Sequence, residues 1–346
     1  MSDKLNILIT FHLKPEFVER IKQVDSRLEV YYEPELFGKP RYLNDQHGEP
    51  FQRTPEQEAR WLELLKKADI LFGYIARPYI TQLSKLAPRL KWNQSPSAGI
   101  GQMVKRSGNT ESDIIFTTAS GVHSTPLGEF CMMSMLIFVK GFFHMAEEKK
   151  RKHWQRTNAT ELRTKTLAVV GLGRVGREVA RMGRCFGMRV IGTKRTTKGV
   201  DPESVNVEKL YPFTDIHPML SEADFVVIIC PHTSETEGLI SEKAIAAMKK
   251  GAVLINISRG SIVDEPALIE ALNSGHLGGF ASDVFWKEPL PPESPFWNMP
   301  NVIISPHSAS TADTENEKQT EIFADNLRHY LDGDPLRNVL DKQLLY

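Results

Sequence analysis

Short runs of apolar residues alternate with longer amphipathic segments through the first third of the chain. Amphipathic spacing predicts helices over Pro15–Val24, Pro55–Lys67 and Ile80–Leu86. The strand-like runs are Leu5–Phe11, Leu28–Tyr32, Asp69–Tyr74, Leu90–Gln94 and Asp113–Thr117. Strands buried on both faces read as short, nearly continuous apolar runs, so this order predicts a parallel sheet covered by helices.

A second series with the same alternation begins at Thr166. Its predicted strands are Leu167–Val170, Arg189–Thr193, Ala223–Cys230, Ala252–Ser258, Gly279–Val284 and Val302–Ser305. Its predicted helices are Arg177–Phe186, Ser241–Lys249 and Glu265–Asn273, each followed by a glycine that favours a helix stop. Six strands are the number in a complete dinucleotide-binding domain.

The two series predict an α/β protein with two Rossmann-like domains, each built on a parallel sheet, and an active site in the interdomain cleft. A last helix, Ala312–Leu331, follows the final strand and is expected to return to the first domain. The predicted parts are therefore a substrate-binding segment 1–125, a dinucleotide-binding domain 126–307 and a returning segment 308–346. The Pro- and Gly-containing stretch 33–54 predicts a long surface loop, which is a lid, an interface arm or a plain excursion.

Length and charge narrow the function classes. The chain has 346 residues, enough for two cores, and its 43 basic residues balance its 43 acidic ones. This balance indicates neither nucleic acid nor an anionic membrane as a partner. The apolar stretch Leu127–Met145 contains Glu129 and Lys140, so a buried or subunit-interface helix is favoured over a membrane span.

The three cysteines suggest a reducing compartment. Cys131, Cys185 and Cys230 form no CxxC pair, so the sequence predicts neither a disulfide framework nor a zinc site, and we expect no metal centre. Cys185 and Cys230 lie in apolar runs and are expected to be buried thiols. With no signal-peptide pattern at the N-terminus, we expect a cytoplasmic protein.

A glycine fingerprint opens the second series. The segment Gly171-Leu172-Gly173-Arg174-Val175-Gly176 directly follows an apolar strand and precedes a helix, which is the context that a dinucleotide site requires. Gly171 permits the tight turn, Gly173 allows the backbone to approach a pyrophosphate, and Gly176 allows close helix packing. Such a motif alone is weak evidence, but its context favours a dinucleotide over a purely structural turn.

The residues after the next strand indicate which dinucleotide is bound. An NAD site commonly has a carboxylate there, whereas this chain has Lys194, Arg195 and Thr196. Two cations and a hydroxyl suit a 2′-phosphate, so the sequence predicts a preference for NADP(H), with NAD(H) also possible. The alternative is that these side chains face solvent and the site does not discriminate.

Three chemically suited residues follow later strands. Arg259, Glu288 and His307 each stand just beyond a strand end, and such ends meet at the ligand-binding edge of a parallel sheet. Hydride addition to a ketone places negative charge on oxygen, so it needs a proton donor and a fixed cation. A carboxylate beside an imidazole favours the protonated ring, which can donate that proton. Each residue alone has an ordinary surface explanation; the three together favour chemistry.

With these motifs in order, the chain resembles the D-isomer-specific 2-hydroxyacid dehydrogenase family over essentially its whole length. The strongest blocks are Thr166–Gly183, Cys230–Thr236, Gly251–Leu272 and Gly279–His307. The resemblance implies that Arg259 binds the substrate carboxylate and polarises the keto oxygen. It also implies that Glu288 pairs with His307, the acid/base, and that Asp283 meets the nicotinamide carboxamide.

The resemblance extends to the other site residues. The cofactor set comprises Gly171, Leu172, Gly173, Arg174, Val175, Gly176, Lys194, Arg195, Thr196, Cys230, Pro231, Thr236, Ser258 and Asp283. In the first domain, Gln94–Gly101 is similar to the family's substrate-carboxylate loop: Ala98 and Gly99 match it, whereas Ser97 and Gly101 depart from it. Arg77 is a further candidate for the substrate, or a surface ion pair. The helix Leu127–Arg151 suggests a homodimer.

The predicted reaction is NADPH-dependent reduction of a short 2-oxo acid, such as glyoxylate or hydroxypyruvate, to the D-2-hydroxy acid, and its reverse. Two rivals stay open. The C-terminal binding protein corepressors share this fold and its dinucleotide site, so a redox-sensing binding protein is one alternative. An NAD-dependent phosphoglycerate dehydrogenase is the other, although the sequence shows no evident phosphate-binding surface in the first domain.

Overall fold

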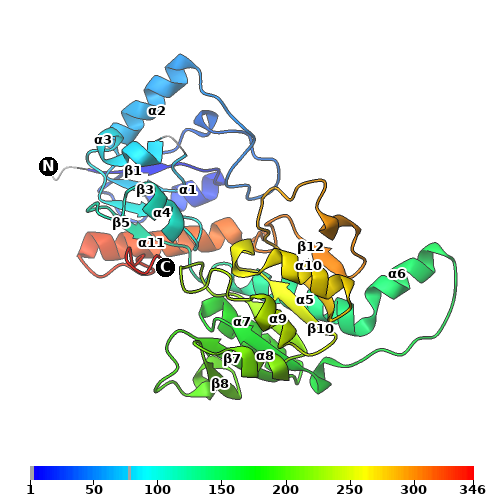
Figure 1. Ribbon diagram of the computed structural model, residues 1–346. Coiled ribbons are helices and arrows are strands. Elements are labelled where there is room, and N and C mark those ends of the chain that lie inside the picture. The colour runs from blue at the N-terminus through cyan, green and yellow to red at the C-terminus, as the bar shows by residue number, and fades with distance from the viewer. Residues whose placement is uncertain (1–3, 77–78) are drawn as a thin grey trace. The chain divides into compact units, whose positions relative to one another are not determined.

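In the computed structural model, which describes residues 4–76 and 79–346, the chain divides into two compact units. Unit 1 comprises Met1–Val122 and Thr311–Tyr346, and unit 2 comprises His123–Ser310 (Figure 1). Each unit contains one parallel sheet with helices packed on it. The predicted fold class, two α/β domains of Rossmann type, is confirmed.

Unit 1 has a five-stranded sheet among its described residues, in the order β2-β1-β3-β4-β5, which is the doubly wound order of flavodoxin-like folds. The strands are β1 Leu5–Ile9, β2 Leu28–Tyr31, β3 Ile70–Phe72, β4 Trp92–Gln94 and β5 Ile115–Thr117. The helices are α1 Pro15–Lys22, α2 Pro55–Lys67, α3 Leu83–Leu86, α4 Gly101–Arg106 and α11 Glu315–Asp332, with 3₁₀ turns η1 Pro34–Leu36 and η2 Tyr79–Gln82.

Local signals explain the helix boundaries in unit 1. The side chains of Thr54 and Gln57 form a reciprocal capping box at the start of α2, and Pro55 occupies the first helical position. The C-terminal helix α11 ends at Gly333, whose φ is 77°. Phe323 of α11 stacks on Phe72 of β3 with ring centroids 4.1 Å apart, so this last helix forms part of the unit 1 core.

Unit 2 has a seven-stranded sheet among its described residues, in the order β12-β11-β10-β9-β6-β7-β8. The strands are β6 Thr166–Val170, β7 Arg189–Lys194, β8 Lys209–Pro212, β9 Phe225–Ile228, β10 Ala252–Asn256, β11 Leu277–Ser282 and β12 Val302–Ile304. The helices are α5 Ser124–Lys140, α6 Phe142–Lys150, α7 Arg174–Cys185, α8 His217–Glu222, α9 Glu242–Ala246 and α10 Glu265–Asn273; the 3₁₀ turns are η3 Leu162–Thr164, η4 Pro202–Val205, η5 Gly260–Ile262 and η6 Pro295–Asn298.

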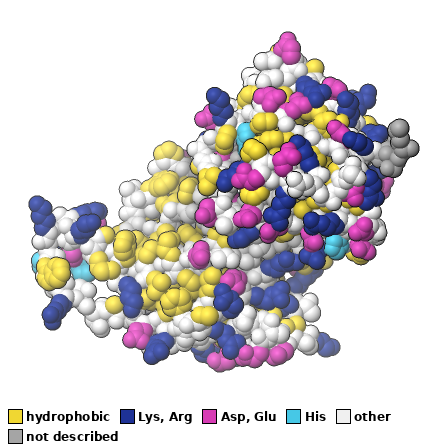
Figure 2. Space-filling view, turned by 180° about the vertical axis from the view of Figure 1, so that it is seen from behind, with side chains coloured by type: hydrophobic (Ala, Val, Ile, Leu, Met, Phe, Trp, Pro, Cys, Tyr) yellow, Lys and Arg dark blue, Asp and Glu magenta, His cyan; other side chains and the backbone are white. Residues whose placement is uncertain are grey.

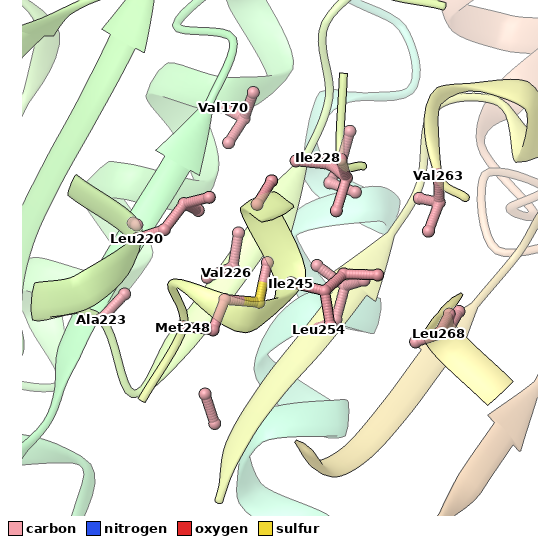
Figure 3. Packing of buried hydrophobic residues seen from close by; sticks show 14 of the residues in the cluster. Val170, Leu220, Ala223, Val226, Ile228, Ile245, Met248, Leu254, Val263 and Leu268 are labelled. Atoms are coloured by element: carbon pink, nitrogen blue, oxygen red, sulfur yellow. The ribbon is translucent and has the colours of Figure 1, made fainter. Parts of the chain in front are cut away.

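Both faces of the unit 2 sheet are buried. Along β9, Val226 and Ile228 belong to one apolar cluster, whereas Phe225 and Val227 belong to the cluster on the opposite face. Figure 3 shows the first cluster, with Val226 of β9 and Leu254 of β10 beside Ile245 of α9. Continuous apolar strands arise because side chains on both faces are removed from water. The order of strands reverses beside β6, which is where such sheets bind ligands.

The structure corrects three expectations. The edge strand β8 and helix α8 were not predicted, because Lys209–Pro212 is short, half-exposed and ends in proline. The predicted helix over 127–151 is instead two helices, α5 and α6, because Gly141 between them has a φ of 66°. Cys185 is exposed and not buried, although Cys131 and Cys230 are buried.

The bend at Gly141 also bears on the apolar composition of this region. In the part of the chain that the structure describes, no single helix is both long and apolar enough to cross a membrane. Helices α5 and α6 meet that criterion only as a pair, and the pair is bent by 63°.

Candidate active site

The glycine fingerprint spans the turn between β6 and α7 and the first three residues of α7. Gly171 has a φ of 112°, and a Cβ there would lie 2.7 Å from the backbone nitrogen of Cys230. A Cβ on Gly176 would lie 1.9 Å from the carbonyl oxygen of Gly171. Both positions therefore require glycine for the fold itself, one for its backbone conformation and the other for close packing.

Gly173 differs from the other two glycines of the fingerprint, Gly171 and Gly176, because a side chain would fit there. A Cβ built on it meets no described atom within 4 Å, and its φ of −76° is open to any residue. Gly173 is the N-cap of α7, which begins at Arg174, three residues before the predicted start, and no side chain caps it within the described residues. The first N–H groups of a helix have no acceptor inside the helix and favour an anion. A bare glycine beside such a helix start fits a pyrophosphate.

The three fingerprint residues that carry side chains, Leu172, Arg174 and Val175, differ in how far they are exposed. Leu172 is buried, and a Cβ on Gly192 of β7 would lie 2.9 Å from its Cδ1, so Leu172 packs into the core. Its N–H donates to the Thr193 carbonyl at 3.1 Å, which ties this turn to the end of β7. Arg174 and Val175 lie in the first turn of α7, the former exposed and the latter half-buried.

The basic segment after β7 is accessible. Lys194 is the last residue of β7 and is half-buried, whereas Arg195 and Thr196 are exposed. The guanidinium of Arg195 lies 3.6 Å from a carboxylate oxygen of Glu235, which follows β9. Exposed ion pairs of this kind contribute little stability, so the Arg195 charge can be offered to a ligand at small cost.

The segment after β9 is held by its own side chains. The Thr236 hydroxyl donates to the Pro231 carbonyl at 2.7 Å and accepts from the Thr233 N–H at 2.8 Å. The Ser258 hydroxyl donates to the Cys230 carbonyl. Burial raises the pKa of Cys230 to about 12, which keeps this thiol protonated. These residues shape the loops beside the fingerprint, and their predicted contacts with a cofactor remain a prediction.

His307 and Glu288 form an ion pair beyond the last two strands. His307 Nδ1 lies 2.7 Å from Glu288 Oε2, and Glu288 Oε1 accepts the Phe285 N–H at 3.0 Å. The two side chains remain 48% and 36% exposed, so the pair is open to a ligand. Because Nδ1 is directed at the carboxylate, Nε2 is the ring nitrogen left for a substrate.

The ion pair changes the pKa of both His307 and Glu288. The hydrogen bond and charge of Glu288 raise the pKa of His307 above its ordinary value of 6.5, against the opposing effect of burial. Burial favours a raised pKa for Glu288, but the hydrogen bonds from His307 and the Phe285 N–H outweigh it and hold that pKa below its usual range. The favoured state is therefore an imidazolium beside a carboxylate.

Asp283 organises the segment that carries His307. Its Oδ1 accepts hydrogen bonds from the Ser305 hydroxyl at 2.6 Å and from the N–H groups of Ser308 and Ala309 at 2.7 and 2.9 Å. Burial raises the pKa of Asp283, against the effect of these hydrogen bonds. These contacts hold both sides of His307, whose φ is 55°. Sequence reasoning assigned Asp283 to the cofactor and missed this tethering role.

Arg259 is half-buried beyond β10. Its Nη1 donates to the Ser258 carbonyl at 2.6 Å, and its own carbonyl accepts from Asn256 Nδ2 at 2.9 Å. The Arg259 charge acts to lower the pKa of both Glu288 and His307, which places it within electrostatic reach of the pair. Asn256 was missed by the sequence reasoning, which read it only as a strand residue.

Glycine also brings the Arg259 segment close to the Glu288 segment. A Cβ on Gly260 would lie 2.1 Å from the carbonyl carbon of Phe285. Strands β10, β11 and β12 are successive neighbours in the sheet, so Arg259, Glu288 and His307 share its carboxyl edge. Unit 2 thus brings together a cation, a carboxylate and an imidazole, the combination expected from the sequence.

The predicted substrate loop lies in unit 1, after β4. Ser95 and Pro96 are buried, whereas Ala98 and Gly99 are exposed. The Ser97 N–H donates to the Ser95 hydroxyl at 3.1 Å, and the Ser97 carbonyl accepts the Ala119 N–H at 3.3 Å. The other substrate candidate, Arg77, lies outside the described residues. Within residues 4–76 and 79–346, no group of three or more His, Cys, Asp or Glu side chains is placed to hold a metal ion.

Comparison with known proteins places this geometry in a family. The model described as D-isomer specific 2-hydroxyacid dehydrogenase, NAD binding domain, matches residues 132–309. A glyoxylate/hydroxypyruvate reductase B from Serratia proteamaculans is 31% identical over 301 residues, covering 84% of this chain and 90% of that protein. A D-3-phosphoglycerate dehydrogenase from Methanocaldococcus jannaschii is 31% identical over 296 residues, 85% of this chain, which spans only 56% of that relative.

A solved structure is similar over the whole chain. It is the NADPH-dependent glyoxylate/hydroxypyruvate reductase from Sinorhizobium meliloti, crystallised in complex with NADP and sulfate. Its TM-score is 0.79 at 26% identity, and the alignment covers 99% of this chain and 100% of that one.

Proposed function

We propose, since the chain belongs to the D-isomer specific 2-hydroxyacid dehydrogenase family, that it reduces a short 2-oxo acid to the D-2-hydroxy acid with NADPH as the hydride donor. The protein is an oxidoreductase with a dinucleotide-binding domain. The observation that carries the proposal is the His307–Glu288 ion pair, which stands with Arg259 at the carboxyl edge of the sheet that holds the glycine fingerprint.

In the proposed mechanism, Arg259 binds the substrate carboxylate and polarises the keto oxygen. His307 donates the proton from Nε2 to the oxygen as negative charge develops there. Glu288 keeps the ring charged beforehand and orients it through Nδ1. The nicotinamide supplies the hydride when bound. In the reverse direction the neutral ring accepts the proton of the hydroxyl group.

We propose NADP(H) as the preferred dinucleotide. The exposed Arg195 and Thr196, with Lys194 at the strand end, offer two cations and a hydroxyl where a carboxylate would repel a 2′-phosphate. The use of NADPH by the reductase from Sinorhizobium meliloti supports this choice. Catalytic efficiency measured with NADPH and with NADH decides it, because equal or better use of NADH is incompatible with the proposal.

Glyoxylate and hydroxypyruvate are the proposed substrates to test first. The names of the relatives support them, and Ala98 and Gly99 are the proposed partners of the substrate carboxylate in unit 1. The decisive assay follows NADPH oxidation by purified protein with 2-oxo acids of increasing size. Rapid turnover supports the proposal, whereas no turnover with any 2-oxo acid and intact NADPH binding favours the redox-sensing alternative.

A second candidate function has one observation in its favour. The identity to a phosphoglycerate dehydrogenase is 31%, the same as that to the reductase from Serratia proteamaculans. The assay therefore includes 3-phosphoglycerate with NAD and its 2-oxo product with NADH. Preferential turnover of these phosphorylated substrates with NAD(H) would favour this second candidate over the first.

We propose that the enzyme is a homodimer formed through α5 and α6. An apolar groove between α5, α6 and α7 is lined by Met132, Met133, Leu136, Ile137, Phe142 and Met145. Figure 2 shows hydrophobic side chains gathered on this part of unit 2, beside the projecting α6. Trp154, which follows α6, is 96% exposed. Apolar patches of this kind favour protein contacts. Sedimentation analysis tests this, because a monomer at micromolar concentration would exclude it.

A further inference from the structure

A chain of hydrogen bonds in unit 1 joins four segments that are distant in sequence. The Tyr74 hydroxyl donates to Gln46 Oε1 at 3.3 Å, and Gln46 Nε2 donates to Glu315 Oε1 at 2.8 Å. Gln319 Nε2 donates to the same Glu315 oxygen at 3.1 Å and to the Pro96 carbonyl at 3.0 Å. The chain thus runs from the end of β3, through the loop 33–54 and helix α11, to the loop after β4.

The two ends of this series of hydrogen bonds, Tyr74 and Pro96, lie at the same sheet edge. Phe72 of β3 is paired in register with Gln94 of β4, so Tyr74 and Pro96 each stand two residues past a paired position. Both residues lie at the carboxyl edge of a parallel sheet, which is the edge that binds ligands in such folds. Pro96 directly precedes the segment 97–99, in which Ala98 and Gly99 are exposed.

The loop 33–54 presents Gln46 from a rigid frame. The buried carboxylate of Asp45 accepts hydrogen bonds from the Arg41 side chain and from the N–H groups of His47 and Gly48. These contacts, led by the Arg41 hydrogen bond, hold the pKa of Asp45 well below its usual range. Asn44 Nδ2 donates to the carbonyls of Ala312 and Asp313, at 2.7 and 3.0 Å, just before α11. The loop is therefore fastened to the segment just before α11 by Asn44, two residues ahead of the Gln46 contact.

The two central residues of this series of hydrogen bonds are buried, so substitution there is costly. Glu315 is 6% exposed and Gln319 is 1% exposed. A buried carboxylate is costly unless it accepts hydrogen bonds, and a buried donor that loses its acceptor is costly as well. Removing the Glu315 carboxylate therefore leaves the amides of Gln46 and Gln319 without the oxygen that they share. It also removes a restraint on the Gln319 amide, which donates to the Pro96 carbonyl.

We propose that Gln46, Glu315 and Gln319 are positioning residues that fix the segment 95–101 in the conformation that receives the substrate carboxylate. This inference rests on the proposed function, because it takes Ala98 and Gly99 as the carboxylate partners. It also assigns a role to the long loop 33–54, which acts as a strut behind the substrate segment and not as a lid. None of the three residues touches the reacting atoms in this role.

The test compares Glu315→Ala, Glu315→Gln and Gln46→Ala with two matched controls. Glu321→Gln removes an exposed carboxylate from the same helix, and Gln52→Ala removes an exposed amide from the same loop. The first readout is amide hydrogen exchange over residues 95–101, which needs neither cofactor nor substrate. The second is the separate change of kcat and of KM for glyoxylate and for NADPH.

We expect Glu315→Ala and Gln46→Ala to accelerate exchange over 95–101 by about tenfold or more. KM for the 2-oxo acid should rise about tenfold, with kcat and KM for NADPH within about threefold of wild type. Glu315→Gln keeps an acceptor oxygen and should recover most of the loss. Both controls should behave as wild type. Gln46 is half-buried on a loop, so its variant tests the proposal even if Glu315→Ala folds poorly.

Two outcomes would overturn the inference. One is a lowered melting temperature in Gln46→Ala with unchanged exchange over 95–101 and unchanged KM, which would make the contact merely structural. The other is a fall in kcat together with an equally large rise in KM for NADPH, which would mean that the variants disturb the whole enzyme and not only the segment 95–101. Failure of the proposed function looks different: wild type would turn over no 2-oxo acid, while exchange over 95–101 would still respond to the variants.

Discussion

The two carboxyl sheet edges of this protein are assembled in different ways. In unit 2, each functional side chain stands just beyond a strand end, and the Asp283 carboxylate that accepts from Ser308 and Ala309 follows the strand that neighbours theirs in the sheet. In unit 1, the segment after β4 is braced through Gln46 and Gln319, which lie far from it in the chain. Reactive side chains that follow successive strands can be recognised from sequence motifs. Hydrogen bonds from distant segments that support a loop cannot.

The largest expected effect tests whether the unit 2 edge carries the chemistry. Replacing His307 by alanine should lower kcat for 2-oxo acid reduction by about 10²–10⁴-fold, because the proton donor is lost. The Kd for NADPH, measured by fluorescence titration, should stay within about threefold of wild type. His217→Ala is the control, since that exposed histidine also pairs with a carboxylate, Asp215, at 3.1 Å. Near-normal turnover of His307→Ala would refute the assignment.

Two glycines of the fingerprint have different roles: Gly173 faces open space for a ligand, whereas Gly176 allows close packing. Gly173→Ala should leave the melting temperature unchanged and weaken NADPH binding by about tenfold or more, because its Cβ meets only open space where a pyrophosphate would approach. Gly176→Ala should destabilise the fold by about 1–3 kcal/mol, because its Cβ would overlap the Gly171 carbonyl. Thermal unfolding and cofactor titration measure the two effects. Equal stability of both variants would contradict this distinction.

Replacing Arg195 by alanine tests the choice of cofactor at the same sheet edge. The loss of one charge-assisted hydrogen bond to the 2′-phosphate should lower kcat/KM for NADPH about tenfold and leave NADH nearly unaffected. Arg184→Ala, which removes an exposed arginine paired with Glu203, serves as the control. A parallel decline with both cofactors would show that Arg195 does not recognise the phosphate.

The pH profile of reduction should sharpen the role of Glu288. The protonated ring is the active form in reduction, so kcat/KM should fall as the pH rises through the raised pKa of His307. Glu288→Gln removes the carboxylate that raises this pKa, and the fall in kcat/KM should then move to lower pH. A profile that stays in place would mean that another group controls it.

Part of this architecture follows directly from the sequence. The amphipathic spacing of Pro55–Lys67 predicts this helix at its observed bounds, and the capping pair Thr54 and Gln57 that stabilises its start is local in sequence as well. The central strands of both sheets were found because they are buried on both faces and therefore read as apolar runs. Strand β8 was missed, since at the sheet edge its residues are only partly removed from water and the apolar signal is weak.

The sequence by itself determined the α/β class, the glycine turn and the order of Arg259, Glu288 and His307 along the strand ends. These features depend on backbone conformation and burial within short segments, which leave a local pattern. Tertiary structure alone decided that the Asp283 carboxylate binds the N–H groups of the segment that carries His307. It alone brought Gln46, Glu315 and Gln319 into one chain of hydrogen bonds. Contacts between residues tens to hundreds of positions apart obey no local periodicity, because only the packing of strands and helices brings their donors and acceptors within reach.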